Sequence, residues 1–158
     1  MRPNVRNLVA SCGVALVAVV LDQVTKAWAR TALAGGPVTA VPGYLDLMLV
    51  GNTGAAFSIG EGSTWLFVLL AVGIVVACVA WVARERTMPL ALACALGAVW
   101  GGGIGNMIDR VASGEVTDFL ATTFVDFPVF NVADIFVTCG VVLVMAIWWR
   151  WDSARGES

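Results

Sequence analysis

The sequence predicts an all-α membrane protein with four transmembrane helices, a small β element and a short interfacial segment on the outer face. The first observation is composition: 59% of the 158 residues are hydrophobic and 13% are charged, against about 45–50% and about 25% in soluble domains. The second is four apolar runs, at 8–29, 64–83, 89–108 and 133–151. Each has close to the roughly 20 residues that a helix needs to cross a bilayer. We therefore expect residues 1–158 to form a single integral membrane domain.

The first run follows Arg2 and Arg6, so it has an alternative interpretation as the apolar part of a secretory signal peptide. We favour a retained helix, because the run is long for a signal peptide and three further runs follow it. The string Val9-Ala10-Ser11-Cys12 looks like a lipoprotein acylation site. Cys12 comes too early for that role, after only a few apolar residues.

Turn residues and alternation predict the structure of the two longer loops. In the loop at 30–63, Pro42-Gly43 marks a turn, residues 44–50 favour a short strand, and Asn52-Thr53-Gly54 marks a second turn. The loop at 109–132 has an apolar middle, from Phe119 to Phe127. We expect this middle to lie in the lipid interface as a short amphipathic segment.

The distribution of basic residues predicts the orientation, because Lys and Arg gather on the cytoplasmic side. With a cytoplasmic N-terminus, three basic residues face outward and six face inward. The outer ones are Lys26, Arg30 and Arg110, and the inner ones are Arg2, Arg6, Arg84, Arg86, Arg150 and Arg155. We therefore predict that both termini are cytoplasmic and that both longer loops face outward.

Composition also excludes several classes of function. The chain has no His, which excludes a Ser-His-Asp triad, a Cys-His dyad and any His-ligated metal site. A net charge of −2 with a pI of 4.9 argues against a nucleic-acid partner. The four cysteines lie far apart inside apolar runs, which favours simple packing roles.

Polar residues in or near the spans collect at the outer ends, although a charge at the bilayer centre costs a few kcal/mol or more. The inner ends have nothing comparable apart from their arginines. The outer set is Asp22, Lys26, Asn106, Asp109, Arg110, Asp118, Asn131 and Asp134. This one-sided clustering predicts a wet polar site at the outer face.

Asp118 and Asp134 are the candidate catalytic pair, because the loop between the third and fourth spans can bring them together. Two carboxyl groups in one low-dielectric site cannot both ionise easily, so one keeps its proton while the other can activate water. The spacing Asn131-x-x-Asp134 equally predicts a helix cap of the capping-box type. From spacing alone, both interpretations stay open.

Plain structural interpretations exist for the other polar residues as well. Asp22 and Lys26 are four residues apart on one helix face, which predicts an ion pair. Arg110 has the alternative of reaching the lipid head groups. The glycines at 101–105 favour close helix packing, as small residues do in membranes.

Five strings occur in order along the chain, from the first span to the start of the fourth. They are Asp22-Gln23-x-Thr25-Lys26; Asn52-x-Gly54-Ala55-Ala56-Phe57; Gly102-Gly103-x-Gly105-Asn106-x-x-Asp109-Arg110; Val116-x-Asp118-Phe119; and Phe127-Pro128-x-Phe130-Asn131-x-Ala133-Asp134. In this order, and with four spans, the chain resembles the lipoprotein signal peptidase family, the signal peptidase II of bacteria.

The resemblance implies an intramembrane aspartic endopeptidase in the bacterial cytoplasmic membrane, with its active site near the outer face. Such an enzyme removes the signal peptide from prolipoproteins and cuts just before a Cys that carries a diacylglyceryl group. The catalytic pair of the family maps to Asp118 and Asp134. The expected partners are prolipoprotein substrates and membrane lipid, with no nucleic acid, and the chain is expected to be monomeric. No metal or cofactor is expected.

The resemblance also gives hypotheses for the supporting residues. Asn106 and Arg110 would hold the substrate backbone near the pair. Asn52 and Gly54 would shape the outer β element, and Asn131 would cap the fourth span. Asp22 and Lys26 would brace the β element against the first span.

Two other classes of function compete with this one. A small proton-coupled transporter also needs an intramembrane acid, and Asp22 is the candidate. A transporter would place its charge near the midplane, however, and would not need two structured outer loops. A noncatalytic membrane scaffold would not need converging carboxylates.

Overall fold

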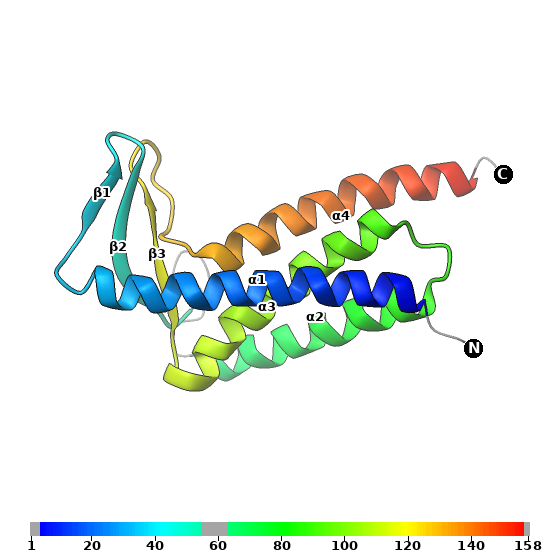
Figure 1. Cartoon of the computed structure of the whole chain (residues 1–158), viewed down its shortest axis with the longest axis horizontal. Helices are drawn as coiled ribbons and strands as arrows, with labels where there is room; N and C mark the ends of the chain where they lie inside the picture. The colour runs from blue at the N-terminus through cyan, green and yellow to red at the C-terminus, as the bar shows by residue number, and fades with distance from the viewer. Residues whose placement is uncertain (1–3, 55–62, 157–158) are drawn as a thin grey trace.

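The computed structural model describes residues 4–54 and 63–156, and four helices form most of it (Figure 1). The helices are α1 (Val5–Ala32), α2 (Thr64–Arg84), α3 (Leu90–Ser113) and α4 (Val132–Gly156). Each contains a stretch long and apolar enough to cross a membrane, so the four predicted spans are confirmed. All four helices are longer than the predicted spans, α2 by a single residue, because helical structure continues past the apolar residues at one or both ends.

A three-stranded antiparallel sheet lies at one end of the helices, and both described ends of the chain lie at the other (Figure 1). Its strands are β1 (Val38–Val41), β2 (Leu45–Asn52) and β3 (Val116–Thr122), in the order β1-β2-β3. The predicted strand at 44–50 corresponds to β2. Pro42-Gly43 forms the predicted turn between β1 and β2, and Gly43 has a φ of 76°.

The segment from Phe119 to Phe127 differs from its prediction as a single amphipathic piece. Its first half belongs to β3, where Phe119 is buried and Leu120 pairs with Phe130 across an isolated bridge. Its second half is irregular, and Phe124 and Phe127 are exposed. The apolar character of the first half comes from burial inside the protein, because β2 and Phe130 flank this strand.

Helix α3 is the centre of the bundle and contacts all three other helices. Its glycines allow these contacts, as predicted. A Cβ added at Gly101 would lie 2.6 Å from the Cα of Ala15 in α1, and one at Gly102 would lie 2.5 Å from the backbone oxygen of Ala133 in α4. Any larger residue there would separate the helices that carry the polar residues of the sheet end.

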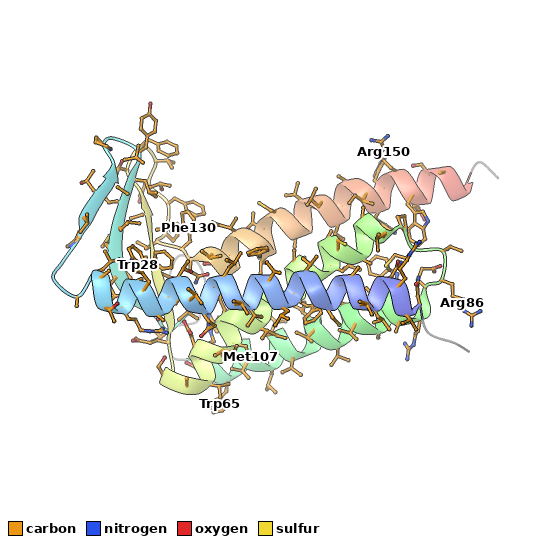
Figure 2. All side chains as sticks on the ribbon, viewed as in Figure 1. Trp28, Trp65, Arg86, Met107, Phe130 and Arg150 are labelled. Carbon is orange, nitrogen blue, oxygen red and sulfur yellow. The ribbon has the colours of Figure 1, made fainter. Side chains whose placement is uncertain are left out.

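The end of the bundle that carries the termini is packed mainly with apolar side chains. Its core contains Cys78, Val82, Met88, Leu92, Ala93 and Leu96. One buried polar contact joins α1 to the loop before α3, where Asn7 Nδ2 donates to the Met88 oxygen at 2.8 Å. Figure 2 shows Arg86 and Arg150 at this end, and Trp28 and Phe130 near the sheet.

Candidate active site

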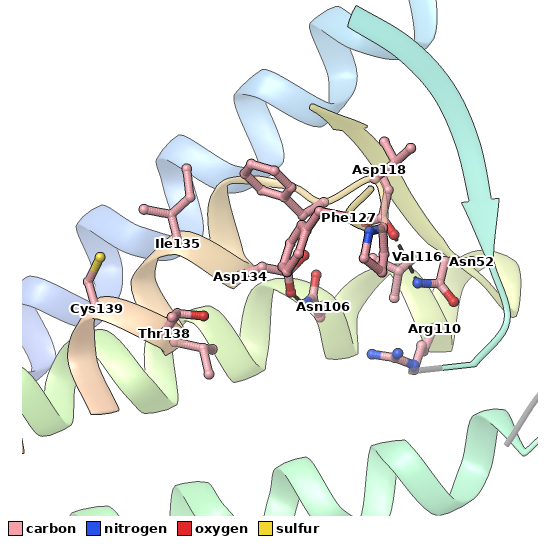
Figure 3. A pocket seen from close by; sticks show the side chains of 14 residues that line it. Asn52, Asn106, Arg110, Val116, Asp118, Phe127, Asp134, Ile135, Thr138 and Cys139 are labelled. Atoms are coloured by element: carbon pink, nitrogen blue, oxygen red, sulfur yellow. Dashed lines mark hydrogen bonds between the residues drawn. The ribbon is translucent and has the colours of Figure 1, made fainter. Parts of the chain in front are cut away.

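A pocket of about 470 Å³ opens where the sheet meets α3 and α4 (Figure 3). Six of its lining residues are polar: Asn52, Asn106, Arg110, Asp118, Asp134 and Thr138. The other eight are Val116, Phe127, Pro128, Val129, Phe130, Ile135, Val137 and Cys139. The pocket therefore joins a compact polar group to an apolar wall, a combination typical of ligand-binding and active sites.

Asp118 and Asp134 both line this pocket, although 15 residues separate them in sequence. Asp118 lies in β3, opposite Val50 of β2, and it is only 2% exposed. Asp134 lies in the first turn of α4. The sequence-based expectation that the loop between α3 and α4 brings these two carboxylates together is therefore met.

Each of the four carboxylate oxygens accepts one hydrogen bond, and the donors come from three asparagines. Asp118 Oδ1 accepts from Asn131 Nδ2 at 2.6 Å, and Asp118 Oδ2 accepts from Asn52 Nδ2 at 2.9 Å. Asp134 Oδ1 accepts from Asn106 Nδ2 at 2.7 Å, and Asp134 Oδ2 accepts from the backbone N–H of Asn131 at 3.1 Å. Neutral amides thus fix both carboxylates without neutralising either charge.

The capping interpretation of Asn131 and Asp134 is confirmed. The backbone N–H of Asp134 donates to Asn131 Oδ1 at 3.0 Å, and the Asn131 N–H donates back to Asp134 Oδ2. This reciprocal pair is a capping box at the start of α4. Asp134 also lines the pocket, and its Oδ1 takes no part in the capping box but accepts from Asn106. Capping and a catalytic role are therefore compatible.

Burial raises the pKa of Asp118 from 3.8 to about 6. The hydrogen bond from Asn52 opposes this rise, and the nearby charge of Asp134 adds to it. A carboxyl group with this pKa holds a proton close to neutral pH, which suits an acid–base role.

A second polar group, the ion cluster, consists of Asp22, Lys26, Arg30 and Asp109. The predicted Asp22–Lys26 ion pair is confirmed, with 2.8 Å between Nζ and Oδ2, and both side chains are fully buried. Lys26 Nζ also lies 3.2 Å from Asp109 Oδ2. Arg30 Nη1 lies 3.9 Å from Asp109 Oδ1, at the partly exposed edge of the cluster.

The ion cluster joins different elements from those that the sequence suggested for Asp22 and Lys26. Asp22 Oδ1 accepts from the backbone N–H of Ala133, so it holds the start of α4. Lys26 reaches α3 through Asp109 and Asn106. The contacts to the sheet come instead from Asp109 and Arg30, which bind the Thr117 N–H and hydroxyl at 3.0 and 2.7 Å.

Sequence reasoning assigned no role to Asp109, Arg30 or Gln23. Gln23 Nε2 donates to Asp22 Oδ2, to the Gly105 oxygen and to Asp109 Oδ1 at 3.1–3.2 Å. For Asp109 the sequence contained a signal: this acidic residue lies three positions after Asn106 and therefore on the same helix face.

Arg110 points into the protein, which overturns the alternative of reaching lipid head groups. Its Nη2 donates to the Gly54 oxygen at 2.7 Å, and its guanidinium carbon lies 5.0 Å from the ring centre of Phe67. Its Nε is buried and has no hydrogen-bond partner among the described residues. Arg110 therefore holds one spare donor beside the pocket that it lines.

The turn at Asn52-Thr53-Gly54 is confirmed in its predicted place. Asn52 Oδ1 accepts from the Gly54 N–H at 2.9 Å, and this leaves Asn52 Nδ2 directed at Asp118. The remaining residues of that string, Ala55, Ala56 and Phe57, lie outside the described residues.

Comparison with known proteins places this arrangement in context. The family model described as signal peptidase (SPase) II matches residues 14–150. A lipoprotein signal peptidase of Symbiobacterium thermophilum is 45% identical over 133 residues, which cover 82% of this chain and 88% of that protein. Another, of Parasynechococcus marenigrum, is 41% identical and covers 91% and 92%.

Solved structures give the same result. A bacterial membrane enzyme determined by the in meso method at 2.3 Å resolution superposes with a TM-score of 0.86 and 33% sequence identity. That match covers 94% of this chain and 92% of the other. A second bacterial membrane enzyme, determined by the same method at 1.9 Å, gives a TM-score of 0.78 and 34% identity, covering 86% and 90%.

Proposed function

Because the chain belongs to the signal peptidase II family, and is thus an aspartic peptidase of lipoprotein processing in a bacterial membrane, we propose that Asp118 and Asp134 are its catalytic pair. One observation carries this proposal: both carboxylates line one pocket, and amides hold all four of their oxygens. The other charged residues nearby have different contacts. Arg110 donates to the Gly54 oxygen, and no residue of the ion cluster lines the pocket.

The chemistry assigns different tasks to the two carboxyl groups. The ionised one takes a proton from water, and the resulting hydroxide attacks the carbonyl carbon of the scissile peptide bond. The protonated one donates its proton toward the carbonyl oxygen. The C–N bond then breaks, and the leaving nitrogen takes a proton from the pair. We assign the donor role to Asp118, because burial favours its protonated form.

The substrate in this proposal is a prolipoprotein whose Cys after the cut carries a diacylglyceryl group. Its signal helix lies in the bilayer and its lipid chains anchor the Cys, so the scissile bond is held at one depth. Such anchoring lowers the entropic cost of attack. The apolar lining residues Ile135, Val137 and Cys139 continue from Asp134 toward the middle of α4, where the last residues of a signal helix would lie.

Arg110 is the residue that we assign to the substrate backbone. Its side chain lines the pocket, and a guanidinium group can donate hydrogen bonds to a peptide carbonyl. Asn106 lines the pocket too, but its side chain is hydrogen-bonded to Lys26, Asn131 and Asp134. Its expected contact with substrate stays a prediction.

The orientation and the assembly state belong to the same proposal. The sheet end faces outward and both termini are cytoplasmic, because the basic residues lie mostly at the other end of the helices. A monomer suffices, because one chain supplies every described donor to the two carboxylates. The transporter alternative loses its candidate acid, since Asp22 is fully buried and paired with Lys26.

The test is a cleavage assay in detergent with a prolipoprotein that carries a diacylglyceryl Cys, beside its unlipidated form. We expect cleavage just before the Cys of the lipidated form alone, and no cleavage by Asp118→Asn or Asp134→Asn. Cleavage by either variant at the native rate would remove the assignment of the pair. Equal cleavage of both substrates would contradict positioning by the lipid.

A further inference from the structure

Lys26 forms one contact that its charge does not require. Its ammonium is fully buried and has three acceptors: Asp22 Oδ2 at 2.8 Å, Asp109 Oδ2 at 3.2 Å and Asn106 Oδ1 at 2.8 Å. The two carboxylates already neutralise the positive charge. The third acceptor is a neutral amide, and it belongs to the residue that also holds Asp134.

This contact determines which way the Asn106 amide faces. An ammonium has three donors and no acceptor, so the amide atom in front of Lys26 has to be the oxygen. Asn131 Nδ2 donates to the same oxygen at 3.0 Å. The Asn106 NH₂ group is then directed at Asp134 Oδ1, at 2.7 Å.

We propose that Lys26 is a positioning residue for the catalytic pair, acting through Asn106 on Asp134. The proposal rests on the function proposed above and adds one residue to its machinery. A chain of two hydrogen bonds, Lys26 to Asn106 to Asp134, leads from the ion cluster to the pocket. It makes Asp134 Oδ1 an acceptor, which suits the carboxylate that takes a proton from water.

Loss of the ammonium removes the stronger of the two groups that orient the amide. When the Asn106 amide turns over, its oxygen faces the Asp134 carboxylate and the two acceptors repel. At metal sites, changing an outer residue that orients a ligand through a hydrogen bond typically costs about 10- to 100-fold in affinity or activity. We expect this range for kcat in Lys26→Met, with little change in KM, because Lys26 does not line the pocket.

The matched control is Gln23→Met. Gln23 donates to Asp22, Asp109 and the Gly105 oxygen, so the variant disturbs the same buried cluster. None of these bonds involves Asn106. We expect Gln23→Met to lower the Tm and to keep kcat near the native value, whereas Lys26→Met lowers both.

A double-mutant cycle gives the sharper measurement. In an Asn106→Ala background, Lys26→Met should cause no further loss of kcat, because its route to Asp134 is already gone. Its effect on Tm should persist, because Asp22 and Asp109 still lose their cation. Losses of kcat that multiply across the cycle, or an equal kcat in Lys26→Met and Gln23→Met, would overturn the proposal.

Two further comparisons keep the result interpretable. If Lys26→Met does not fold, Asp22→Asn/Lys26→Met removes one carboxylate with the ammonium and is compared with Asp22→Asn alone, with the same expected ratio in kcat. Asp134→Asn separates the two proposals. If Asp134→Asn is active, the proposed function fails; if it is inactive while Lys26→Met keeps the native kcat, only the role of Lys26 fails.

Discussion

Two groups of acidic side chains lie at the sheet end of the helices, and they differ in what surrounds them. In the ion cluster, Asp22 and Asp109 share Lys26, and Arg30 lies near Asp109. In the proposed catalytic pair, Asp118 and Asp134 accept hydrogen bonds from amides, and no salt bridge to either is found in the described part of the chain.

The difference indicates a structural role for the ion cluster and a chemical role for the pair. A carboxylate beside a cation stays ionised, and breaking such a buried pair costs stability. Two carboxylates held by amides repel each other, so one of them accepts a proton readily. Asn106 contacts both groups, since its oxygen accepts from Lys26 and its NH₂ donates to Asp134. Aspartates therefore serve two purposes in this chain, stability in the ion cluster and acid–base chemistry in the pair. The Asn106 amide connects the two groups.

The same substitution at each group gives the largest contrast. Asp118→Asn should lower kcat by about 10²–10⁴-fold, the usual contribution of acid–base catalysis. Asp22→Asn should lower the Tm, because it breaks the pair with Lys26, and it should leave more kcat than Asp118→Asn does. Both variants are compared by cleavage rate per folded molecule and by thermal unfolding in detergent. Equal losses of kcat would show that the two groups act as one unit.

Removal of the shared cation is the second test of the comparison. Lys26→Met should lower the free energy of unfolding by about 3–5 kcal/mol, the cost of breaking a buried ion pair from one side. The double variant Asp22→Asn/Lys26→Met should recover part of this loss, because it leaves Asp109 with Arg30 as its cation. Thermal or denaturant unfolding in one detergent measures both. A double variant less stable than Lys26→Met would contradict the charge argument.

Hydropathy predicted the four helices because each of them has to cross the bilayer as a continuous apolar run. The sheet was harder to predict. Turn residues flank both β1 and β2, but β1 is only four residues long and entirely exposed, so no alternation of burial marks it as a strand. β3 mixes apolar residues with two Thr and one Asp, and residues of both faces are buried, so no regular alternation marks it as a strand.

The pair was predictable because the loop between α3 and α4 is short enough to bring Asp118 close to Asp134. The amide partners were not predictable as partners, since which oxygen each asparagine faces depends on the register of β2 and β3. Arg110 shows the same limit. Its position at the end of α3 fitted a contact with lipid head groups, but the chain at Gly54 accepts its hydrogen bond.

The pH dependence of stability tests the buried position of Asp118 in the pair. Burial raises the pKa of Asp118 from 3.8 to about 6, so the folded state binds this proton more tightly than the unfolded state does. The stability that this proton contributes is complete below about pH 4 and is lost as the pH rises through 6. At about 1.36 kcal/mol per pKa unit, the loss amounts to about 2–3 kcal/mol.

Unfolding of the native chain and of Asp118→Asn between pH 4 and 7 measures this loss. The difference in unfolding free energy between the two should change across that window in favour of the variant at higher pH. A difference that stays constant would contradict the raised pKa. If Asp118 is the proton donor, kcat/KM should also fall above about pH 6, because the free enzyme loses the donated proton.

The smallest expected effect tests how tightly the ion cluster is packed. A Cβ added at Gly105 would lie 2.6 Å from Asp22 Oδ2 and 3.3 Å from the Ala133 Cβ, whereas one at Gly103 meets nothing within 4 Å. Gly105→Ala should therefore cost about 1–3 kcal/mol by overpacking. Gly103→Ala, two residues away on the same helix, should be neutral or stabilising by up to about 1 kcal/mol, because Ala favours a helix more than Gly does. Thermal unfolding of the two variants in the same detergent gives the comparison. Similar Tm values would show that Asp22 can move away without loss of stability, and the ion cluster would then not be tightly packed.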